Sequence, residues 1–280
     1  MAQPRIVSLL PSATEIAVAL GLGESLVGRS HECDYPLFVK ALPVVTSTRL
    51  EKGLTSRQID DRIQEIVRQG LSVYEVDTAL LRDLRPDLIL TQSQCAVCAV
   101  TPADLEEALG DWIGTAPTLL SLAPDTLEDV WSDFAKVAEA AGIPERASSV
   151  VGDLKERMSG LSRSSAERMD RPRVAAIEWI DPLMAAGNWV PELIEAAGGH
   201  PLFARAGEHS SWLNWDDLIA ADPDLIVASV FGTIDHALAG LRGRAAPRIS
   251  LDHVTVRLGK GDAARTLAIE TAQAWTSEEG

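Results

Sequence analysis

The segments LLRDLRPDLIL (80–90) and DLIAADPDLIV (217–227) constrain the fold most, because they repeat one pattern in the two halves of the chain. Each has a short run with helical spacing, then Pro-Asp-Leu-Ile, then an apolar end, which predicts a helix followed by a buried strand. Strand-like and helix-like segments alternate around each copy. The repeat therefore predicts two similar α/β lobes, each built on a parallel sheet covered by helices.

The rest of each half follows the same alternation. Short apolar runs predict strands at 5–10, 25–30 and 174–180, and helical spacing predicts helices at 11–23, 54–70 and 190–199. The first helix opens at Pro11, and Ser12 or Thr14 is expected to cap it. Segments 77–92 and 215–230, which contain the repeat, each predict a helix followed by a strand.

Residues 124–169 contain no strand signal and keep apolar residues three or four apart, which predicts a long helical segment. Gly142-Ile-Pro144 divides it into two parts. We therefore expect an N-terminal lobe at 1–123, a connecting backbone helix at 124–169 and a C-terminal lobe at 170–280. Ligands of open parallel sheets bind at the carboxyl ends of strands, so two such Rossmann-like lobes predict a ligand cleft between them.

Composition narrows the partners and the compartment. The net charge of −16 disfavours nucleic acid and anionic membranes, which would be repelled. No charged-then-apolar leader and no membrane span are visible, and three cysteines, an odd number, argue against a disulfide framework. The expectation is a cytoplasmic monomer without membrane insertion; it would be extracytoplasmic only if the start of the chain were wrongly assigned.

Four stretches carry a family resemblance: RIVSLLPSATEIAVALGLGESLVGRSHECDYP, LRPDLILTQSQCAVCAV, RPRVAAIEWIDPLMAAGNWVPELIEAAGG and DLIAADPDLIVAS. Together they resemble the helical-backbone (class III) substrate-binding proteins of ABC transporters, and most closely the cobalamin-binding branch. The resemblance implies a non-enzymatic protein that binds vitamin B12 or a related corrinoid, with no catalytic cofactor. It also implies an ABC permease as partner.

Two features depart from that family. Transported members carry a docking carboxylate on each lobe; Asp216 fits this role in the second lobe, whereas the first offers Ala79 at the equivalent place. Residues 244–280 lack the closing strand, Asn/Pro-containing loop and helix that the branch usually shows, so this stretch is expected to be atypical.

The predicted cleft is lined by loops that follow strands and by the starts of the helices behind them. The candidate ligand-binding residues at these places are Ser12, Thr14, His31, Glu32, Tyr35, Gln92, Gln94, Cys95, Cys98, Trp179, Asn188, Trp189 and Trp212. His31 is either an axial ligand to the metal of a corrinoid or haem, or a polar loop residue bonded to backbone. Glu32, Asp34 and Tyr35 are expected to hydrogen-bond the ligand's amide rim.

The pair Cys95 and Cys98 has several interpretations. Thr101 and Asp104 form a predicted capping box, which leaves the cysteines upstream of the helix start and disfavours a thioredoxin-type redox pair. A speculative zinc site would use His31, Cys33, Cys95 and Cys98. Packing of the two thiols as small hydrophobic groups and direct thiol contact with a bound metal complex are two further interpretations.

Tryptophan dominates the aromatic residues, with seven against four Phe and two Tyr. Trp131 falls on the apolar stripe of the long helical segment and is expected in the core. Four more lie where the second lobe should meet the ligand: Trp179, Trp189, Trp212 and Trp215. Aromatic faces suit a flat macrocycle, while ordinary packing is the competing explanation for each of them.

Corrinoid binding is therefore the leading functional hypothesis. The same fold binding haem or a ferric siderophore is the first alternative. A metal-dependent enzyme that uses the Cys/His loops is an alternative of another class, and an interaction protein with a decayed cleft is a third. A dinucleotide enzyme is disfavoured, because GLGESL lacks the required glycine spacing after a strand.

Overall fold

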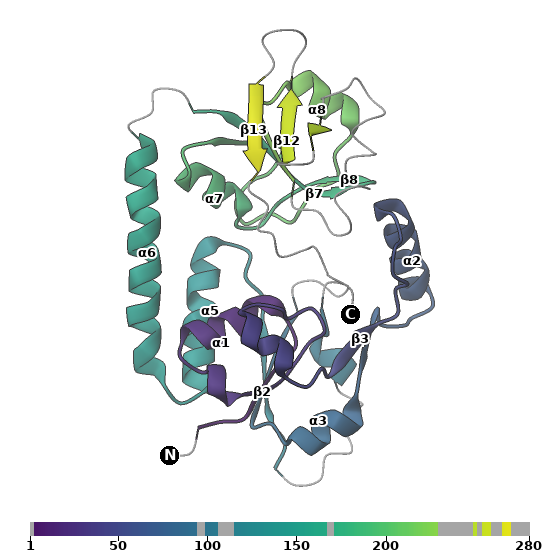
Figure 1. Cartoon of the computed structure of the whole chain (residues 1–280), viewed down its shortest axis with the longest axis vertical. Helices are drawn as coiled ribbons and strands as arrows, with labels where there is room; N and C mark the ends of the chain where they lie inside the picture. Colours follow the sequence, from purple (N-terminus) through teal and green to yellow (C-terminus); the bar gives the residue numbers. More distant parts are fainter. Residues whose placement is uncertain are drawn as a thin grey trace. The chain divides into compact units, whose positions relative to one another are not determined.

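The computed structural model describes residues 3–93, 99–105, 115–166, 171–228, 249–250, 254–258 and 265–269. The chain divides into two compact units (Figure 1). Unit 1 comprises Met1–Lys52 and Asp61–Arg163, and unit 2 comprises Gly53–Asp60 and Ser164–Gly280. Each unit contains parallel strands and helices, which confirms the predicted α/β class.

Unit 1 is built on four parallel strands in the order β2-β1-β5-β6. Their bounds are β1 Ile6–Ser8, β2 Leu26–Arg29, β5 Leu88–Gln92 and β6 Thr118–Leu122. Two further strands, β3 Thr46–Thr48 and β4 Tyr74–Val76, fall between β2 and β5 in the sequence and form a separate antiparallel pair. The helices up to β6 are α1 Pro11–Ala19, η1 Gly23–Ser25, η2 Leu37–Ala41, α2 Ser56–Arg68 and α3 Thr78–Leu84.

Both faces of this sheet are buried, as expected for parallel strands between helices. Ile6 and Leu90 belong to one apolar cluster, whereas their neighbours Val7 and Ile89 belong to another on the opposite face. The first cluster also holds Phe134. The alternation of side chains along each strand produces these two layers.

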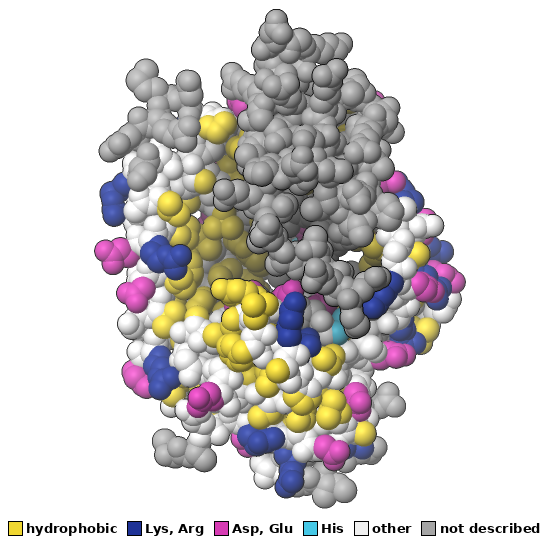
Figure 2. Space-filling model, viewed as in Figure 1, with side chains coloured by type: hydrophobic (Ala, Val, Ile, Leu, Met, Phe, Trp, Pro, Cys, Tyr) yellow, Lys and Arg dark blue, Asp and Glu magenta, His cyan; other side chains and the backbone are white. Residues whose placement is uncertain are grey.

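The predicted helical segment forms two helices, α5 Leu127–Ala140 and α6 Pro144–Ala166. Gly142, with φ +73°, makes the turn between them. Buried residues of α5 and the start of α6 share the core cluster of β1 and β5, so α5 is part of unit 1. Figure 2 shows hydrophobic side chains gathered over α1 and the adjacent side of α6. The predicted division into two lobes and a connecting helix stays a prediction.

In unit 2, strand β7 pairs in parallel with β10 and β9 and antiparallel with β8. The bounds are β7 Arg173–Ile180, β8 Leu183–Ala185, α7 Val190–Ala196, β9 His200–Leu202, α8 Trp215–Ala221 and β10 Leu225–Ala228. A separate antiparallel sheet contains β11 Ile249–Ser250, β12 Val254–Leu258 and β13 Arg265–Ile269. In residues 244–280, the stretch predicted to be atypical, the structure describes the residues of these three strands.

In both copies of the sequence repeat the helix ends with the same backbone conformation. Arg85 and Asp222 end α3 and α8 in the left-handed conformation, with φ of 45° and 43°. The aspartate that follows the proline then binds the first strand of its own unit. The Asp87 carboxylate accepts from the Arg5 N–H at 2.8 Å, and the Asp224 carboxylate accepts from the Arg173 N–H at 2.9 Å.

The start of α1 differs from the expectation. Leu10 is the N-cap residue and makes no side-chain cap, so the prediction of Ser12 or Thr14 as the cap is wrong. Pro11 occupies the first helical position, where its missing N–H costs nothing. The Thr14 hydroxyl instead donates back to the Leu10 carbonyl at 3.2 Å.

The packing of α5 generates a stability prediction. Phe134 is 6% exposed in the cluster shared with β1 and β5. Phe134→Ala should lower the free energy of unfolding by about 3–5 kcal/mol, because it leaves a cavity in that core. Leu161→Ala, at a position of α6 that is 65% exposed, is the matched control and should change it by about 0.5 kcal/mol or less. Equal losses in urea denaturation would contradict the assignment of α5 to this core.

Candidate functional site

In unit 1 the predicted ligand residues lie at one edge of the sheet. Strands β2, β1 and β5 are adjacent and parallel, so their carboxyl ends lie at the same edge. Ser12 follows β1 and is exposed, His31 follows β2, and Gln92 ends β5 partly buried. The topology therefore brings together three groups of residues that are far apart in sequence.

His31 is held by two hydroxyl groups. Thr46 Oγ1 lies 3.0 Å from Ser30 Oγ, accepts from the His31 backbone N–H at 3.1 Å and is hydrogen-bonded to Nδ1 at 2.8 Å. The neutral ring can make the last bond in either tautomer, because a hydroxyl both donates and accepts. Burial, with Arg29 nearby, lowers the pKa of His31 and favours this neutral form.

Tyr74 supports the residues that follow β2. Its ring lies 5.7 Å from that of His31, tilted by 48°, and its hydroxyl donates to Glu32 Oε1 at 3.3 Å. Burial raises the pKa of Glu32, and the hydrogen bond from Tyr74 opposes this rise. Burial and the nearby Glu32 raise the pKa of Tyr74. Tyr35, three residues after Glu32, is 62% exposed.

Thr14 and Cys33 lie inside unit 1, both with 0% of their surface exposed. The Thr14 hydroxyl oxygen and Cys33 Sγ are hydrogen-bonded at 3.1 Å, and this contact anchors the loop after β2. Burial raises the pKa of the Cys33 thiol. Zinc binding needs a thiolate, so this environment opposes the proposed role of Cys33 as a ligand. The described residues contain no group of three or more His, Cys, Asp or Glu side chains arranged to hold a metal ion.

The remaining candidates of this unit, Gln94, Cys95 and Cys98, lie outside the described residues. The capping box that follows them is present, with the Thr101 N–H donating to the Asp104 carboxylate at 2.7 Å and the Asp104 N–H to Thr101 Oγ1 at 3.4 Å. The helix start is thus downstream of both cysteines, as predicted.

Unit 2 presents its candidate tryptophans in different ways. Trp212 is 63% exposed, whereas Trp189 is partly buried at the N-cap of α7. Trp179 is partly buried in β7, and its indole N–H donates to the Asp181 carbonyl at 3.1 Å. Trp215 is partly buried and packs against the buried cluster around β7. Among these four tryptophans, Trp212 therefore has the largest exposed fraction.

Asn188 occupies a left-handed turn between β8 and α7, with φ +55°. Its backbone N–H donates to the Glu208 carbonyl at 2.7 Å. Its side-chain Oδ1 is buried and has no hydrogen-bond partner among the described residues. Asp216, the predicted docking residue, lies exposed in the first turn of α8.

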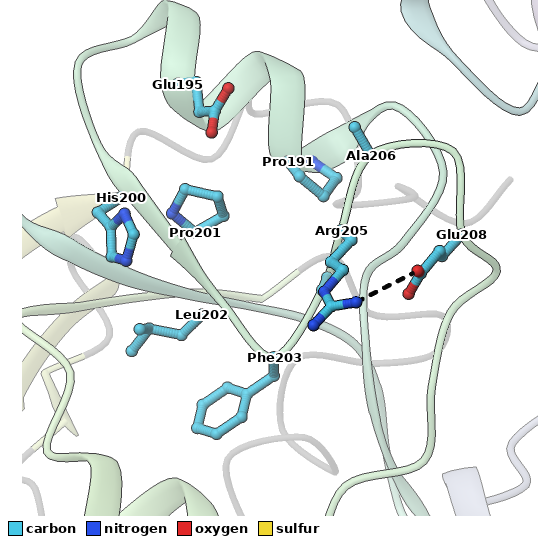
Figure 3. A pocket seen from close by; sticks show the side chains of 10 residues that line it. Pro191, Glu195, His200, Pro201, Leu202, Phe203, Arg205, Ala206 and Glu208 are labelled. Carbon is cyan, nitrogen blue, oxygen red and sulfur yellow. Dashed lines mark ion pairs between the residues drawn. The ribbon is translucent and has the colours of Figure 1, made fainter.

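A pocket of about 650 Å³ lies in unit 2 between α7, β9 and the loop that follows β9 (Figure 3). Phe203 and an ion pair between Arg205 and Glu208, 3.8 Å apart, line the loop side. Its size suits a drug-sized molecule. None of the residues predicted from the sequence line it.

Several supporting residues have no visible sequence signal. Thr46 and Tyr74 reach the His31 loop from β3 and β4, far along the chain. Ser210 lies in an ordinary polar run, yet its hydroxyl donates to Glu178 Oε2. Hydroxyl side chains of this kind gain their roles only from the tertiary structure.

Residues 6–235 match the family described as periplasmic binding protein. The chain belongs to this family. The predicted family resemblance is therefore confirmed, and the members to which the chain is similar are solute-binding proteins.

Curated relatives include two named vitamin B12-binding protein, which supports the cobalamin-binding branch. The one from Photorhabdus laumondii is 24% identical over 226 residues, covering 80% of this chain and 70% of the relative. The one from Yersinia pestis (strain Pestoides F) is 27% identical over 230 residues, covering 81% and 70%.

Solved structures show the same fold. The periplasmic vitamin B12 binding protein BtuF of Vibrio cholerae aligns with a TM-score of 0.58 at 22% identity, covering 85% of this chain and 78% of BtuF. The periplasmic heme-binding protein RhuT from Roseiflexus sp. RS-1 aligns with a TM-score of 0.58 at 25% identity, covering 86% and 80%.

Membership in this family corrects one expectation. The prediction of a cytoplasmic protein is wrong, because the family is one of periplasmic binding proteins. The odd number of cysteines suggests a reducing compartment. Cys33, however, is wholly buried and its thiol has a raised pKa, so it is shielded from oxidants. A thiol of this kind carries no information about the compartment. Within the described ranges, none of the helices is both long and apolar enough to span a bilayer.

The environment of His31 predicts its titration. Its pKa should lie below the ordinary value of about 6.5, because burial and Arg29 disfavour the charged ring. The stability that depends on the neutral ring is then complete above about pH 6.5 and is lost as the pH falls through the folded-state pKa. NMR titration, with the signal assigned by His31→Gln, measures this pKa. His31→Gln should lose less stability than the wild type between about pH 7 and pH 5; a pKa above 6.5 would contradict the geometry.

Proposed function

We propose that this chain binds a corrinoid such as cobalamin, as the solute-binding component of an ABC import system. The observation that carries the proposal is the similarity of about four fifths of the chain to relatives named vitamin B12-binding protein. Those relatives bind a solute, and we propose binding without catalysis for this chain too. A permease partner, docking through Asp216, and a monomeric state are parts of the same proposal.

Each unit, taken by itself, offers candidate ligand contacts. Trp212 offers a largely exposed aromatic surface, which suits the flat face of a macrocycle. Trp179, Trp189 and Tyr35 are the further aromatic candidates. Corrinoids carry amide side chains around the ring, and Glu32, Gln92 and Asn188 can exchange hydrogen bonds with such groups. Asn188 Oδ1 is buried and has no hydrogen-bond partner in the described part of the chain, which supports its inclusion.

Haem is the second candidate, and one observation favours it. The haem-binding protein RhuT is 25% identical to this chain, and Nδ1 of His31 is bonded to Thr46, so Nε2 is the ring nitrogen that would bind a metal centre. The same nitrogen would approach the cobalt of a corrinoid. The two candidates therefore share this residue, and titration must separate them.

Direct titration tests the proposed function. Cyanocobalamin and adenosylcobalamin should quench the tryptophan fluorescence of the full chain at concentrations up to about 10–50 μM, since micromolar affinity corresponds to a binding free energy of about −8 kcal/mol. Haemin, followed by its Soret absorbance, is the parallel titration. Binding of haemin without binding of either cobalamin would transfer the proposal to the second candidate, and binding of neither would reject both.

Replacement of the exposed tryptophan tests how the ligand is held. Trp212→Ala should weaken cyanocobalamin binding about tenfold or more, because it removes aromatic stacking and buried apolar area. Trp131→Phe is the matched control: this ring packs on Phe134 in α5, 6.3 Å between centroids, and the variant should keep wild-type affinity. Isothermal titration calorimetry gives both constants, and unchanged affinity in Trp212→Ala would remove this residue from the proposed site.

A further inference from the structure

The exposed Trp212 lies on a segment, residues 207–213, that runs antiparallel to residues 183–188 within unit 2. Met184 and Trp212 form a bridge pair in this arrangement. The backbone hydrogen bonds between the two segments are Leu213 N to Leu183 O at 2.9 Å, Ala185 N to Ser211 O at 2.9 Å, Asn188 N to Glu208 O at 2.7 Å and Gly207 N to Asn188 O at 3.0 Å. The backbone of Trp212 is thus paired, although its side chain is exposed.

At Gly187 the hydrogen bond between the two segments is made to a side chain. Its N–H donates to the side-chain Oγ of Ser210 at 3.0 Å. The two backbones are so close here that a Cβ on Gly187 would lie 2.5 Å from both the Glu208 carbonyl oxygen and the Ser210 nitrogen. The Ser210 hydroxyl therefore takes the place of a backbone carbonyl as the acceptor.

The same hydroxyl reaches a third element. Ser210 Oγ donates its proton to Glu178 Oε2, and Glu178 belongs to β7, the central strand of the sheet. Hydrogen bonds to a charged carboxylate are stronger than those between neutral groups. One side chain, two residues before Trp212, thus joins the exposed segment both to Gly187 and to β7.

We propose that Ser210 and Glu178 are positioning residues that hold Trp212 in the orientation in which it meets the ligand. The inference deepens the proposed function and rests on it for the role of Trp212. Neither residue needs to touch the ligand. The neighbouring Ser211 hydroxyl donates instead to the Phe203 carbonyl at 3.2 Å, on the loop after β9, so it provides a matched control in the same segment.

The first test needs no ligand. The full chain is labelled with 5-fluorotryptophan, and the ¹⁹F signal of Trp212 is assigned by Trp212→Phe. Ser210→Ala should shift or broaden this signal, Ser210→Thr should restore it because the hydroxyl is kept, and Ser211→Ala should leave it in place. Glu178→Gln, which keeps the side-chain shape but weakens the hydrogen bond, should move the same signal less, and it serves if Ser210→Ala does not fold.

The second test measures affinity for cyanocobalamin. Ser210→Ala should weaken binding about two- to tenfold, because a less ordered Trp212 must be fixed on binding. In a Trp212→Phe background the same substitution should have a clearly smaller effect, since its effect passes through the indole. A purely structural role would instead give equal losses in both backgrounds.

The outcomes separate the two proposals. A Trp212 signal unmoved by Ser210→Ala and Glu178→Gln, or moved as much by Ser211→Ala, overturns the positioning role whatever the ligand is. A wild-type chain that does not bind cyanocobalamin rejects the proposed function alone, because the ¹⁹F comparison still decides whether Ser210 positions Trp212.

Discussion

The aspartate that follows the proline in each copy of the repeat makes the contact on which the rest of the structure depends. Asp87 and Asp224 each bind the backbone at the start of the first strand of their own unit. Hydrogen bonds to a carboxylate are among the stronger ones, and the bond of Asp87 directly adjoins the first paired residues of β1 and β5, Ile6 and Leu88. With the register set, the carboxyl ends of β1, β2 and β5 fall at one edge, and the loops that leave these strands become neighbours.

Those loops are then held by hydroxyl groups rather than by regular secondary structure. In unit 1, Thr46 and Ser30 hold His31, and Thr14 holds Cys33. In unit 2, Ser210 joins the Trp212 segment to β7. A hydroxyl both donates and accepts, so one short side chain can connect two partners in a confined space. Candidate ligand residues are thereby presented on loops whose backbones are ordered by their neighbours.

Local patterns predict the elements well and the individual roles less well. Helical spacing and glycine breaks locate α5, α6 and the turn at Gly142, because these signals act within a few residues. Thr14 shows the opposite case: the pattern predicts it as a cap of α1, and the residue is instead buried, with its hydroxyl bonded to Leu10 and Cys33. The compartment is predicted wrongly, because cysteine count reflects the chemistry of individual thiols and not where a domain works.

By itself, the sequence determined that the chain has two α/β halves, since the repeated Pro-Asp-Leu-Ile segments require a helix end and then a buried strand wherever they occur. It also determined the abundance of tryptophan that motivates a macrocyclic ligand. Only the tertiary structure decided which of the described tryptophans is most exposed, that Thr46 holds Nδ1 of His31, and that Ser210 reaches Glu178. These contacts join residues 15 to 32 positions apart, and local spacing carries no information about pairs that only chain folding brings within hydrogen-bond distance.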